Sequence, residues 1–495
     1  MSIRAKINQL NIETRAFIDG KYVELASRME KYSSIDGRRI PDLHVANESD
    51  INSAVDIAKR RYNEGVWRDT APQEKKRIML RLAALMEEHR EELALLDTIE
   101  TGRSFKNFYE DSIPKAIDAL QWFAESIDKY FEHSIPPRRD AFAVVTKMPI
   151  GVVGLITPWN DPLVVDVWKF APALLMGNSV VLKPAEQASF SILKVAKLAL
   201  DAGVPPGIFN VVPGYGHIAG KALALHPKVG GIFFTGSSEV GKLILQYAGQ
   251  SNMKKVGLEC GGKSPFIVSH RCKDIEEAAR TLAKNIFYNQ GQICSAPSRL
   301  IVHRSIKEEF LEILVQESKK YVPSDPLSAD CNVGAVVSRE QLERITGYIH
   351  EGIEAGAKVI TGAQTLEPVP GGCYVAPTIL DAVSAQDRIA QEEIFGPVLV
   401  CIAFDSIDEA VQIANDSRYG LAASIWTNDI DEAYYVSRAL EVGLVHINSY
   451  GEDDMSVPFG GVKESGLGKD RSLYAFEEYS YTKTTWMKFS APDDR

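Results

Sequence analysis

Apolar residues in the first quarter of the chain recur every three or four positions. They do so within residues 51–62, 78–96 and 113–123. This spacing places apolar side chains on one face of a helix, so it predicts a helix-rich beginning. A strand-like run, AFAVVTK at 141–147, follows the two prolines at 136 and 137. We expect this run to form a protruding hairpin arm.

From residue 151 onward, short apolar runs rich in β-branched residues alternate with helical patterns. The runs lie at 151–156, 179–183, 208–212 and 231–235, and the helical patterns lie at 163–176, 187–202 and 216–225. Continuous apolar strands that alternate with helices predict a parallel sheet covered on both faces. A second series has candidate strands at 265–268, 299–303, 398–404 and 424–426. We therefore predict two α/β lobes with a ligand cleft between them.

Charge and cysteine usage narrow the class of protein. The formal net charge is -11, which argues against nucleic acid or an anionic membrane as the main partner. No apolar stretch is long enough to span a bilayer, and the first residues lack an apolar signal core. The six cysteines occur singly, without a CxxC pair, so we expect neither a metal site nor a disulfide framework. A cytoplasmic enzyme with reduced thiols is the expectation.

The stretch FFTGSSEVGKLIL at 233–245 reads as a strand, a Gly-Ser turn and a helix. Helix N-termini attract anions, so a pyrophosphate could lie near Gly236 and Ser237. An ordinary βα turn with a serine N-cap explains the stretch equally well. We expect the apolar face of the helix to consist of Val240, Leu243, Ile244 and Tyr247.

Three polar residues at predicted turns could carry chemistry. Cys294 lies in the polar turn NQGQIC, Glu259 ends a strand before Gly-Gly, and Asn160 ends a strand before a helix. Each has an ordinary alternative, namely a buried cysteine, a satisfied loop carboxylate and a plain N-cap. The residues alone leave these alternatives open.

Together, seven motifs resemble those of the aldehyde dehydrogenase superfamily, in the family's order and over about residues 17 to 486. They are PWN (158–160), KPAE (183–186), FTGSSEVG (234–241), LECGGKSP (258–265), NQGQIC (289–294), EEIFGPV (392–398) and PFGGVKESGLGKD (458–470). The resemblance implies an α/β fold with two doubly wound domains and a small β assembly domain.

The resemblance also implies where the domains begin and end. Residues 1–131 and 148–261 would form a Rossmann-like NAD-binding domain, and residues 262–445 the catalytic domain. Residues 132–147 and 478–495 would form an oligomerisation arm with exposed strand edges, which favours a homodimer or a homotetramer. Residues 446–477 would return to the NAD-binding domain and the substrate tunnel.

The mechanism implied by the resemblance uses the three polar residues. Cys294 would attack the aldehyde, and the Asn160 amide with the Cys294 backbone N–H would hold the oxyanion. After hydride transfer to a nicotinamide, a thioester would remain, and Glu259 would activate water to release a carboxylic acid. Lys169 and Asp470 match the positions of a supporting relay, although both could belong to a structural ion pair.

The implied cofactor is NAD, with NADP possible. A carboxylate at position 186 accepts the ribose hydroxyls of NAD and repels a 2′-phosphate. Without the resemblance, Lys183 and Glu186 could equally be solvated surface charges. The cofactor-binding positions that match the family are Thr157, Trp159, Lys183, Glu186, Gly216, Gly236, Ser237, Val240, Glu393 and Phe395.

The implied substrate tunnel departs from the family's usual pattern. The family often has an aromatic residue where this chain has Asp161, and the segment at 448–461 adds Glu452, Asp453 and Asp454. Carboxylates near one passage would attract a cationic substrate, although some of these acids could point to solvent. The aromatic walls would be Trp168, Tyr450 and Phe459.

The segment DMSVPFGG looks like the γ-glutamyl-γ-aminobutyraldehyde and ω-aminoaldehyde dehydrogenase branch. We therefore expect an amino- or acylamino-aldehyde as substrate. Aromatic or simple aliphatic aldehydes are the alternative, and a catalytically silent family member is an alternative of another class. A CoA-acylating relative is disfavoured because Glu259 is present.

Cys260 is a further departure, because relatives mostly carry Leu or Ala beside the catalytic glutamate. This thiol could simply pack against its neighbours. It could also form a disulfide with Cys294 under oxidation.

Overall fold

The apolar runs of the first lobe form the middle of an eight-stranded sheet. The computed structural model of the protein describes residues 3–452 and 454–490. Five strands run parallel in the order β9-β8-β7-β10-β11, namely β7 (Val152–Ile156), β8 (Ser179–Lys183), β9 (Phe209–Val211), β10 (Val229–Thr235) and β11 (Lys255–Glu259). The predicted parallel sheet is thus confirmed, and Glu259 ends a strand as expected.

Both edges of this sheet are antiparallel, which the apolar pattern did not predict. On one side, β1 (Ala16–Ile18) pairs with β9 and with β2 (Lys21–Val23). On the other, β23 (Gly466–Leu467) pairs with the end of β11, beside Glu259. Strands of two or three residues give no usable period, so only the folded chain reveals them. A separate antiparallel pair, β3 (Ser27–Tyr32) and β4 (Arg39–Val45), was also missed. Most residues of β3 are exposed to solvent, so this strand has no apolar pattern to detect.

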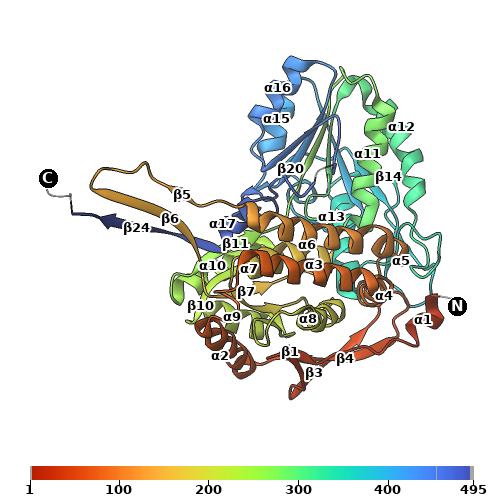
Figure 1. Ribbon diagram of the computed structural model, residues 1–495. Helices are drawn as coiled ribbons and strands as arrows, with labels where there is room; N and C mark the ends of the chain where they lie inside the picture. Colours follow the sequence, from red (N-terminus) through yellow and green to blue (C-terminus); the bar gives the residue numbers. More distant parts are fainter. Residues whose placement is uncertain (1–2, 453, 491–495) are drawn as a thin grey trace.

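Helices cover both faces of the first sheet (Figure 1). In β7, Val153 and Leu155 belong to one apolar core, whereas Val152 and Ile156 belong to the opposite one. The first core is closed by α3 (Pro72–Glu88), α4 (Arg90–Thr101), α6 (Ile113–Ser126), α7 (Pro162–Leu175) and α8 (Phe190–Ala202). The second is closed by α2 (Glu48–Glu64), α9 (Lys221–Leu225) and α10 (Ser238–Gln250). Alternation of side chains along a strand explains why both faces must be covered.

The second lobe contains a seven-stranded sheet in the order β14-β17-β18-β13-β12-β20-β21. All neighbours are parallel except the edge strand β14 (Lys358–Thr361). The other strands are β12 (Pro265–Val268), β13 (Arg299–His303), β17 (Thr378–Asp381), β18 (Val398–Phe404), β20 (Ala422–Trp426) and β21 (Leu444–Ile447). The helices packed on this sheet are α11 (Ile275–Phe287), α12 (Lys307–Ser318), α13 (Arg339–Glu354), α15 (Ile407–Asn415) and α16 (Ile430–Ala439). All four predicted strands of this lobe are confirmed.

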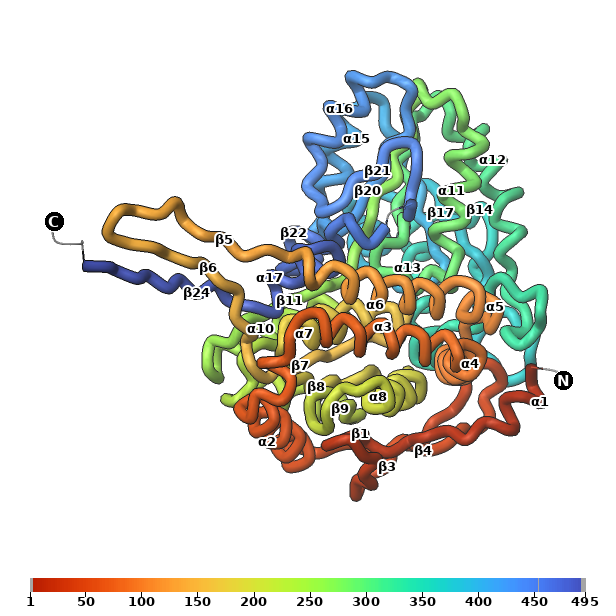
Figure 2. Tube along the Cα trace, in the orientation of Figure 1, coloured from red at the N-terminus to blue at the C-terminus, as the bar shows by residue number. Residues whose placement is uncertain are grey.

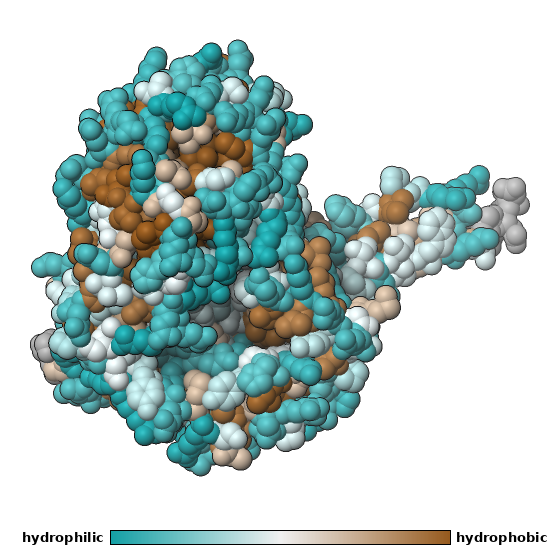
Figure 3. All heavy atoms as spheres, turned by 180° about the vertical axis from the view of Figure 1, so that it is seen from behind, coloured by the Kyte–Doolittle hydropathy of each residue, from teal (hydrophilic) through white to brown (hydrophobic). Residues whose placement is uncertain are grey.

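A three-stranded arm extends away from both lobes (Figures 2 and 3). Its order is β24-β6-β5, with β5 (His133–Ser134), β6 (Ala141–Pro149) and β24 (Ser480–Lys488). The predicted strand at 141–147 is confirmed, and its main partner comes from the far end of the chain. Apolar side chains are exposed along β24 and just beyond it, namely Tyr481, Trp486, Met487 and Phe489. The role of the arm in assembly stays a prediction.

No helix among the described residues is long and apolar enough to cross a membrane.

Candidate active site

A cavity of about 230 Å³ is lined by residues of both lobes and of the segment that returns to the first lobe. It brings together the three residues predicted to carry chemistry, Asn160, Glu259 and Cys294. Trp168 and Phe459 form an aromatic wall, with ring centroids 5.7 Å apart. Residues separated by more than a hundred positions along the chain thus converge on one enclosed space.

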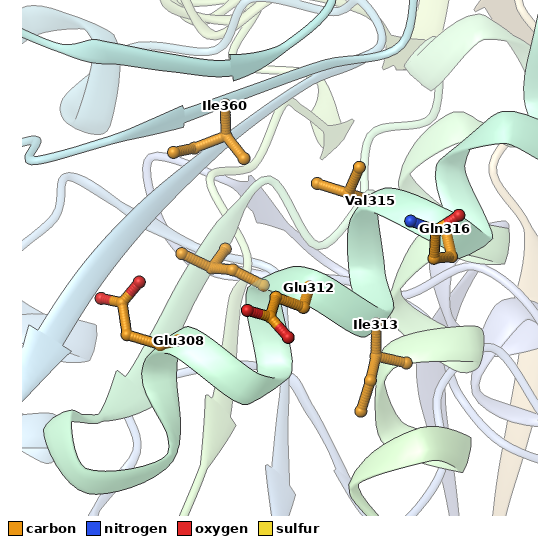
Figure 4. A pocket seen from close by; sticks show the side chains of 7 residues that line it. Glu308, Glu312, Ile313, Val315, Gln316 and Ile360 are labelled. Atoms are coloured by element: carbon orange, nitrogen blue, oxygen red, sulfur yellow. The ribbon is translucent and has the colours of Figure 1, made fainter.

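A larger hollow, of about 510 Å³, lies on the outer face of the second lobe (Figure 4). Its lining comes from α12 and from Ile360, and it includes Glu308 and Glu312. It contains no cysteine or histidine that could act as a nucleophile or base. Size alone therefore does not identify the reactive site.

The turn before Cys294 has an unusual backbone. Asn289 and Gln290 lie in the left-handed region, with φ of 49° and 56°, inside the short helix η4 (Tyr288–Gly291). Non-glycine residues adopt this conformation only where the surroundings hold them there. The Asn289 side chain contributes by donating to the Asn160 carbonyl at 2.8 Å.

Cys294 is partly exposed to the cavity. Burial raises the pKa of its thiol to about 12, and the nearby carboxyl groups of Glu393 and Glu259 add to the shift. A thiol in this state is a poor nucleophile until positive charge or a base comes near it.

Asn160 lies in the loop between β7 and α7. Its side-chain amide donates at 3.0 Å to the carbonyl of Gln292, which lies two residues before Cys294. The residue at the N-cap of α7 is Asp161, so the alternative of Asn160 as a plain N-cap is wrong. Asn160 instead lines the same cavity as Cys294.

Glu259 is 6% exposed, and its Oε2 atom has no hydrogen-bond partner within the described chain. Burial raises the pKa of its carboxyl well above the ordinary value, and the negative charge of Asp470 raises it further. Lys169 acts in the opposite direction and binds Asp470 at 2.9 Å. The predicted relay residues thus lie next to Glu259 as a buried ion pair.

Five predicted cofactor residues line the cavity, namely Trp159, Gly236, Ser237, Glu393 and Phe395. The rings of Trp159 and Phe395 meet edge to face at 5.3 Å. Burial raises the pKa of Glu393 to about 7, and its Oε1 accepts from the Gly262 N–H at 3.0 Å. A Cβ at Gly261 would lie 2.1 Å from Glu393 Oε2, so only glycine permits this approach.

Three other predicted cofactor residues form a second group, at the end of β8. Lys183 binds Glu186 at 3.1 Å, and the Gly216 N–H donates to Glu186 at 2.7 Å. Lys183 is only 3% exposed, so the alternative of a solvated surface charge is wrong for this residue. Thr157 lies beside the group, since its N–H donates to the Lys183 carbonyl at 3.2 Å.

These residues suit a dinucleotide. A Cβ built at Gly216 would meet no atom within 4 Å, so the space beside the Glu186 carboxylate is open. The positive end of α10, a helix of 13 residues, begins at the Gly236–Ser237 turn, where anions are stabilised. Ser237 caps this helix by accepting from the Val240 N–H at 3.3 Å, as in the ordinary βα turn that was the alternative interpretation of this stretch.

The predicted apolar face of α10 was partly wrong. Val240 and Leu243 are 40% and 41% exposed, and the buried face consists of Ser238, Gly241, Ile244 and Ala248. The phase shifts because Gly241 packs against Cys260, where a Cβ would lie 2.8 Å from the sulfur. A face built around glycine and serine is invisible to a search for large apolar residues.

Three of the predicted tunnel acids, Asp161, Glu452 and Asp454, do not line the cavity. Asp161 binds the buried Arg103 at 3.0 Å, and Asp454 and Glu452 are exposed to solvent. Asp454 accepts from the Ser456 backbone N–H at 2.7 Å, and Asp453 lies outside the described residues.

Tyr450 is also absent from the cavity lining. It is 4% exposed, packs in the core of the second lobe, and its hydroxyl donates to the Ser295 carbonyl. Its predicted contact with substrate stays a prediction, as do those of the acids.

Sequence reasoning missed several residues of the lining. Gln341 and Arg344, near the start of α13, donate to the carbonyls of Phe395 and Glu393, each at 2.9 Å. Val165 and Thr235 also line the cavity. Thr235 lies within the FTGSSEVG motif, although its own role was not predicted. No motif contains Gln341 or Arg344, so nothing in the sequence indicated that α13 would reach this cavity.

Cys260 shares the cavity with Cys294, and burial raises the pKa of its thiol to about 12. All six cysteines are free thiols. A disulfide between positions 260 and 294 under oxidation stays a prediction.

Comparison with known proteins identifies the family of the chain. The aldehyde dehydrogenase family profile matches residues 22–485. The NADP/NAD-dependent aldehyde dehydrogenase PuuC of Escherichia coli (strain K12) is 41% identical, over 98% of each chain. Two solved structures match with a TM-score of 0.97 over 99% of this chain and 100% of theirs.

One of these structures is an indole-3-acetaldehyde dehydrogenase in complex with NAD+, 44% identical, and the other is a γ-glutamyl-γ-aminobutyraldehyde dehydrogenase from Burkholderia cenocepacia, 46% identical. The resemblance and the fold class predicted from the motifs are confirmed. The chain belongs to the aldehyde dehydrogenase family.

Proposed function

We propose that the protein oxidises an amino- or acylamino-aldehyde to its carboxylic acid with NAD, and more weakly with NADP. The observation that carries the reaction type is the convergence of Cys294, Asn160 and Glu259 on one cavity. The same cavity contains Glu393 and Phe395, at positions where the family binds the nicotinamide ribose and ring.

The first step is attack by Cys294. The thiol loses its proton to solvent, its sulfur bonds to the carbonyl carbon, and the C=O pair of electrons moves to the oxygen, an oxyanion held by the Asn160 amide and the Cys294 N–H. Burial and the carboxyl groups of Glu393 and Glu259 raise the pKa of the Cys294 thiol. Oxidised nicotinamide is positively charged, so its presence in this cavity would lower that pKa. The nucleophile is then activated only in the complex with cofactor.

Glu393 and Phe395 would hold the nicotinamide, which would supply the acceptor for the hydride that leaves the former carbonyl carbon. Cys294 then carries a thioester, and Glu259 removes a proton from the water that attacks it. The new C–O bond forms, the C–S bond breaks, and the carboxylic acid leaves with Cys294 restored. One water and one NAD are consumed for each NADH produced. The raised pKa of Glu259 suits a base that works near neutral pH.

The adenosine half of the cofactor is assigned to the group at the end of β8. The ribose hydroxyls would donate to Glu186, which Lys183 and the Gly216 N–H hold in place. A 2′-phosphate would meet the Glu186 carboxylate directly, which favours NAD over NADP. The pyrophosphate would lie at the Gly236–Ser237 turn, with Val240 near the adenine.

The substrate class rests on two supports. The relative from Burkholderia cenocepacia is a γ-glutamyl-γ-aminobutyraldehyde dehydrogenase, and the exposed acids Glu452 and Asp454 precede the wall residue Phe459 in one segment. Exposed carboxylates raise the local concentration of a cationic substrate. An aromatic aldehyde is the second candidate, because Trp168 and Phe459 form an aromatic wall and another relative is an indole-3-acetaldehyde dehydrogenase.

A substrate panel tests the proposal. Initial rates of NADH and NADPH formation would be measured with 4-aminobutanal, its γ-glutamyl derivative, indole-3-acetaldehyde and propanal. We expect the highest kcat/KM for one of the first two with NAD. A higher kcat/KM for indole-3-acetaldehyde would move the assignment to the second candidate.

Cys294→Ala tests the reaction type. Turnover should fall by on the order of 10⁴-fold or more, since the bond-forming atom is lost. Cys272→Ala is the matched control, because Cys272 is a half-buried thiol outside the cavity and its loss should leave turnover unchanged. Undiminished NADH formation by Cys294→Ala would refute the mechanism.

The arm is assigned to assembly with a second copy of the chain. Its exposed apolar residues, including Trp486 at 56% exposure, favour burial against a partner. Light scattering of the purified protein should give the mass of a dimer or a tetramer, and a monomer at micromolar concentration would contradict the assignment.

A further inference from the structure

Arg103 is a buried cation close to the active site that the mechanism does not use. It follows Gly102, the left-handed C-cap of α4, and its side chain is 2% exposed. A guanidinium removed from water needs charged or polar partners, and the choice of partners fixes its position. The faces of Phe108 and Tyr288 enclose it, each with the ring centroid 4.9 Å away.

The two terminal nitrogens of Arg103 bind one residue from each catalytic loop. Nη1 donates to Asp161 Oδ1 at 3.0 Å, and Nη2 donates to the Tyr288 hydroxyl. Asp161 directly follows Asn160, and Tyr288 begins the η4 turn that leads to Cys294. The planar guanidinium therefore sets the distance between the loop with the oxyanion donor and the loop with the nucleophile.

Direct bonds between these loops depend on the same spacing. Asn160 donates to the Gln292 carbonyl at 3.0 Å, and Asn289 donates to the Asn160 carbonyl at 2.8 Å. Asn289 is in a left-handed conformation that its surroundings must maintain. A change in the separation of the loops would weaken both bonds together.

Asp161 behaves as a partner of Arg103 and not as a helix cap. It occupies the N-cap position of α7, where an aspartate usually accepts from the first backbone N–H groups, yet its side chain makes no such bond. Its carboxylate turns to Arg103 instead. An ion pair at 3.0 Å leaves little net charge to attract a cationic substrate.

The charged groups behind Tyr288 are also matched. Asp111 accepts from the Tyr288 hydroxyl at 2.7 Å and binds Lys115 at 2.9 Å, and Arg103 lies 3.9 Å from Asp111. Two carboxylates, Asp111 and Asp161, thus face two cations, Arg103 and Lys115. This balance favours a positioning role over recognition of substrate charge.

We propose that Arg103 is a positioning residue for the oxidation, holding Asn160 and Cys294 at their working separation through Asp161 and Tyr288. The inference rests on the proposed function, since it assigns Asn160 and Cys294 the roles given above. Asp161, which stands where the family often has an aromatic residue, is then one arm of a clamp formed by Arg103, Asp161 and Tyr288.

The main test is Arg103→Met, with kcat and KM measured for propanal and 4-aminobutanal. We expect kcat to fall about ten- to a hundredfold for both aldehydes, because small misplacements of reacting groups are costly. The KM for NAD should stay within about twofold. Arg103→Lys, which keeps the charge but cannot bind both loops, should give an intermediate kcat.

Lys254→Met is the matched control for a buried cation outside the site. Lys254 donates to the carbonyls of Ala224 and His226, so its loss should lower the melting temperature but leave kcat unchanged. If Arg103→Met does not fold, Tyr288→Phe removes one arm of the clamp and should lower kcat severalfold.

A double-mutant cycle with Asn160→Ala separates positioning from general destabilisation. If Arg103 acts through Asn160, Arg103→Met should cost much less in the Asn160→Ala background than in the wild type. Fully additive losses, or a normal kcat for Arg103→Met, would overturn the inference. A loss confined to the KM for 4-aminobutanal would also overturn it, in favour of charge recognition. Absence of wild-type turnover with every aldehyde would instead refute the proposed function.

Discussion

Two lysine–carboxylate pairs lie around the site and differ in how the functional carboxylate is balanced by charge. At the catalytic pair, Lys169 binds Asp470 at 2.9 Å, while the nearby Glu259 is influenced by Lys169 and Lys469 only at longer range. At the cofactor pair, Lys183 binds the functional carboxylate of Glu186 itself, at 3.1 Å. A buried carboxyl group without a bonded cation retains its proton more readily, whereas a paired carboxylate stays charged and can accept hydrogen bonds from a ligand.

The difference in balance explains the expected work of each pair. Glu259 has a raised pKa because burial and Asp470 disfavour its charged form, which makes it a suitable base for water. Glu186 is held by Lys183 and by the Gly216 N–H, with open space beside it for hydroxyl donors. Similar residue types thus serve proton transfer at one place and ligand binding at the other.

The largest effect should come from breaking the catalytic pair with Lys169→Met. This change leaves Asp470 buried without its ion-pair partner, which should destabilise the fold by about 3 kcal/mol. It should also raise the pKa of Glu259 further, because Lys169 favours the charged carboxylate. The base must be deprotonated, so the acidic limb of the kcat profile should move to higher pH.

Asp470→Asn is the opposite change at the same pair. It removes the charge that raises the pKa of Glu259, so the acidic limb should move to lower pH. Measuring kcat between pH 5 and 9 for both variants checks the signs. Limbs that move in the same direction, or that stay at the wild-type position, would show that the pair does not control Glu259.

The sequence predicted the strand that carries Lys183 because it is a continuous buried run. It also placed Glu259 at a strand end, although β11 begins with an exposed lysine and is buried only over its last three residues. It also grouped Cys294, Asn160 and Glu259, which line one cavity, although only through the family's motifs. It could not pair Asp161 with Arg103, which lies 58 positions earlier and has no motif of its own. Such pairings arise from tertiary contacts between loops, and sequence periodicity reports only the local face of an element.

The two-residue strand β23 shows the same limit. It lies beside Glu259 at the edge of the first sheet, yet it is too short to show any period. Gln341 and Arg344 reach the cavity from the first turns of α13, a helix that none of the sequence motifs contains. The polar surroundings of the site therefore depend more on the fold than the reactive residues do.

The smaller effect should come from Glu186→Ser at the cofactor pair. Serine can keep one hydrogen bond to the ribose hydroxyls, and loss of the other, which contributes about 1.5 kcal/mol, should raise the KM for NAD about tenfold. The KM for NADP should fall, because the repulsion of a 2′-phosphate disappears while Lys183 remains nearby.

The matched control is Glu308→Ser, because Glu308 is an exposed glutamate in the outer hollow of Figure 4 and its loss should change neither KM. Equal changes for NAD and NADP would mean that Glu186 supports the fold of the β8 end without contacting the ribose. The acidic limb of the kcat profile, assigned to Glu259, should keep its position in the Glu186→Ser variant, because Glu186 is not among the charged groups that shift the pKa of Glu259.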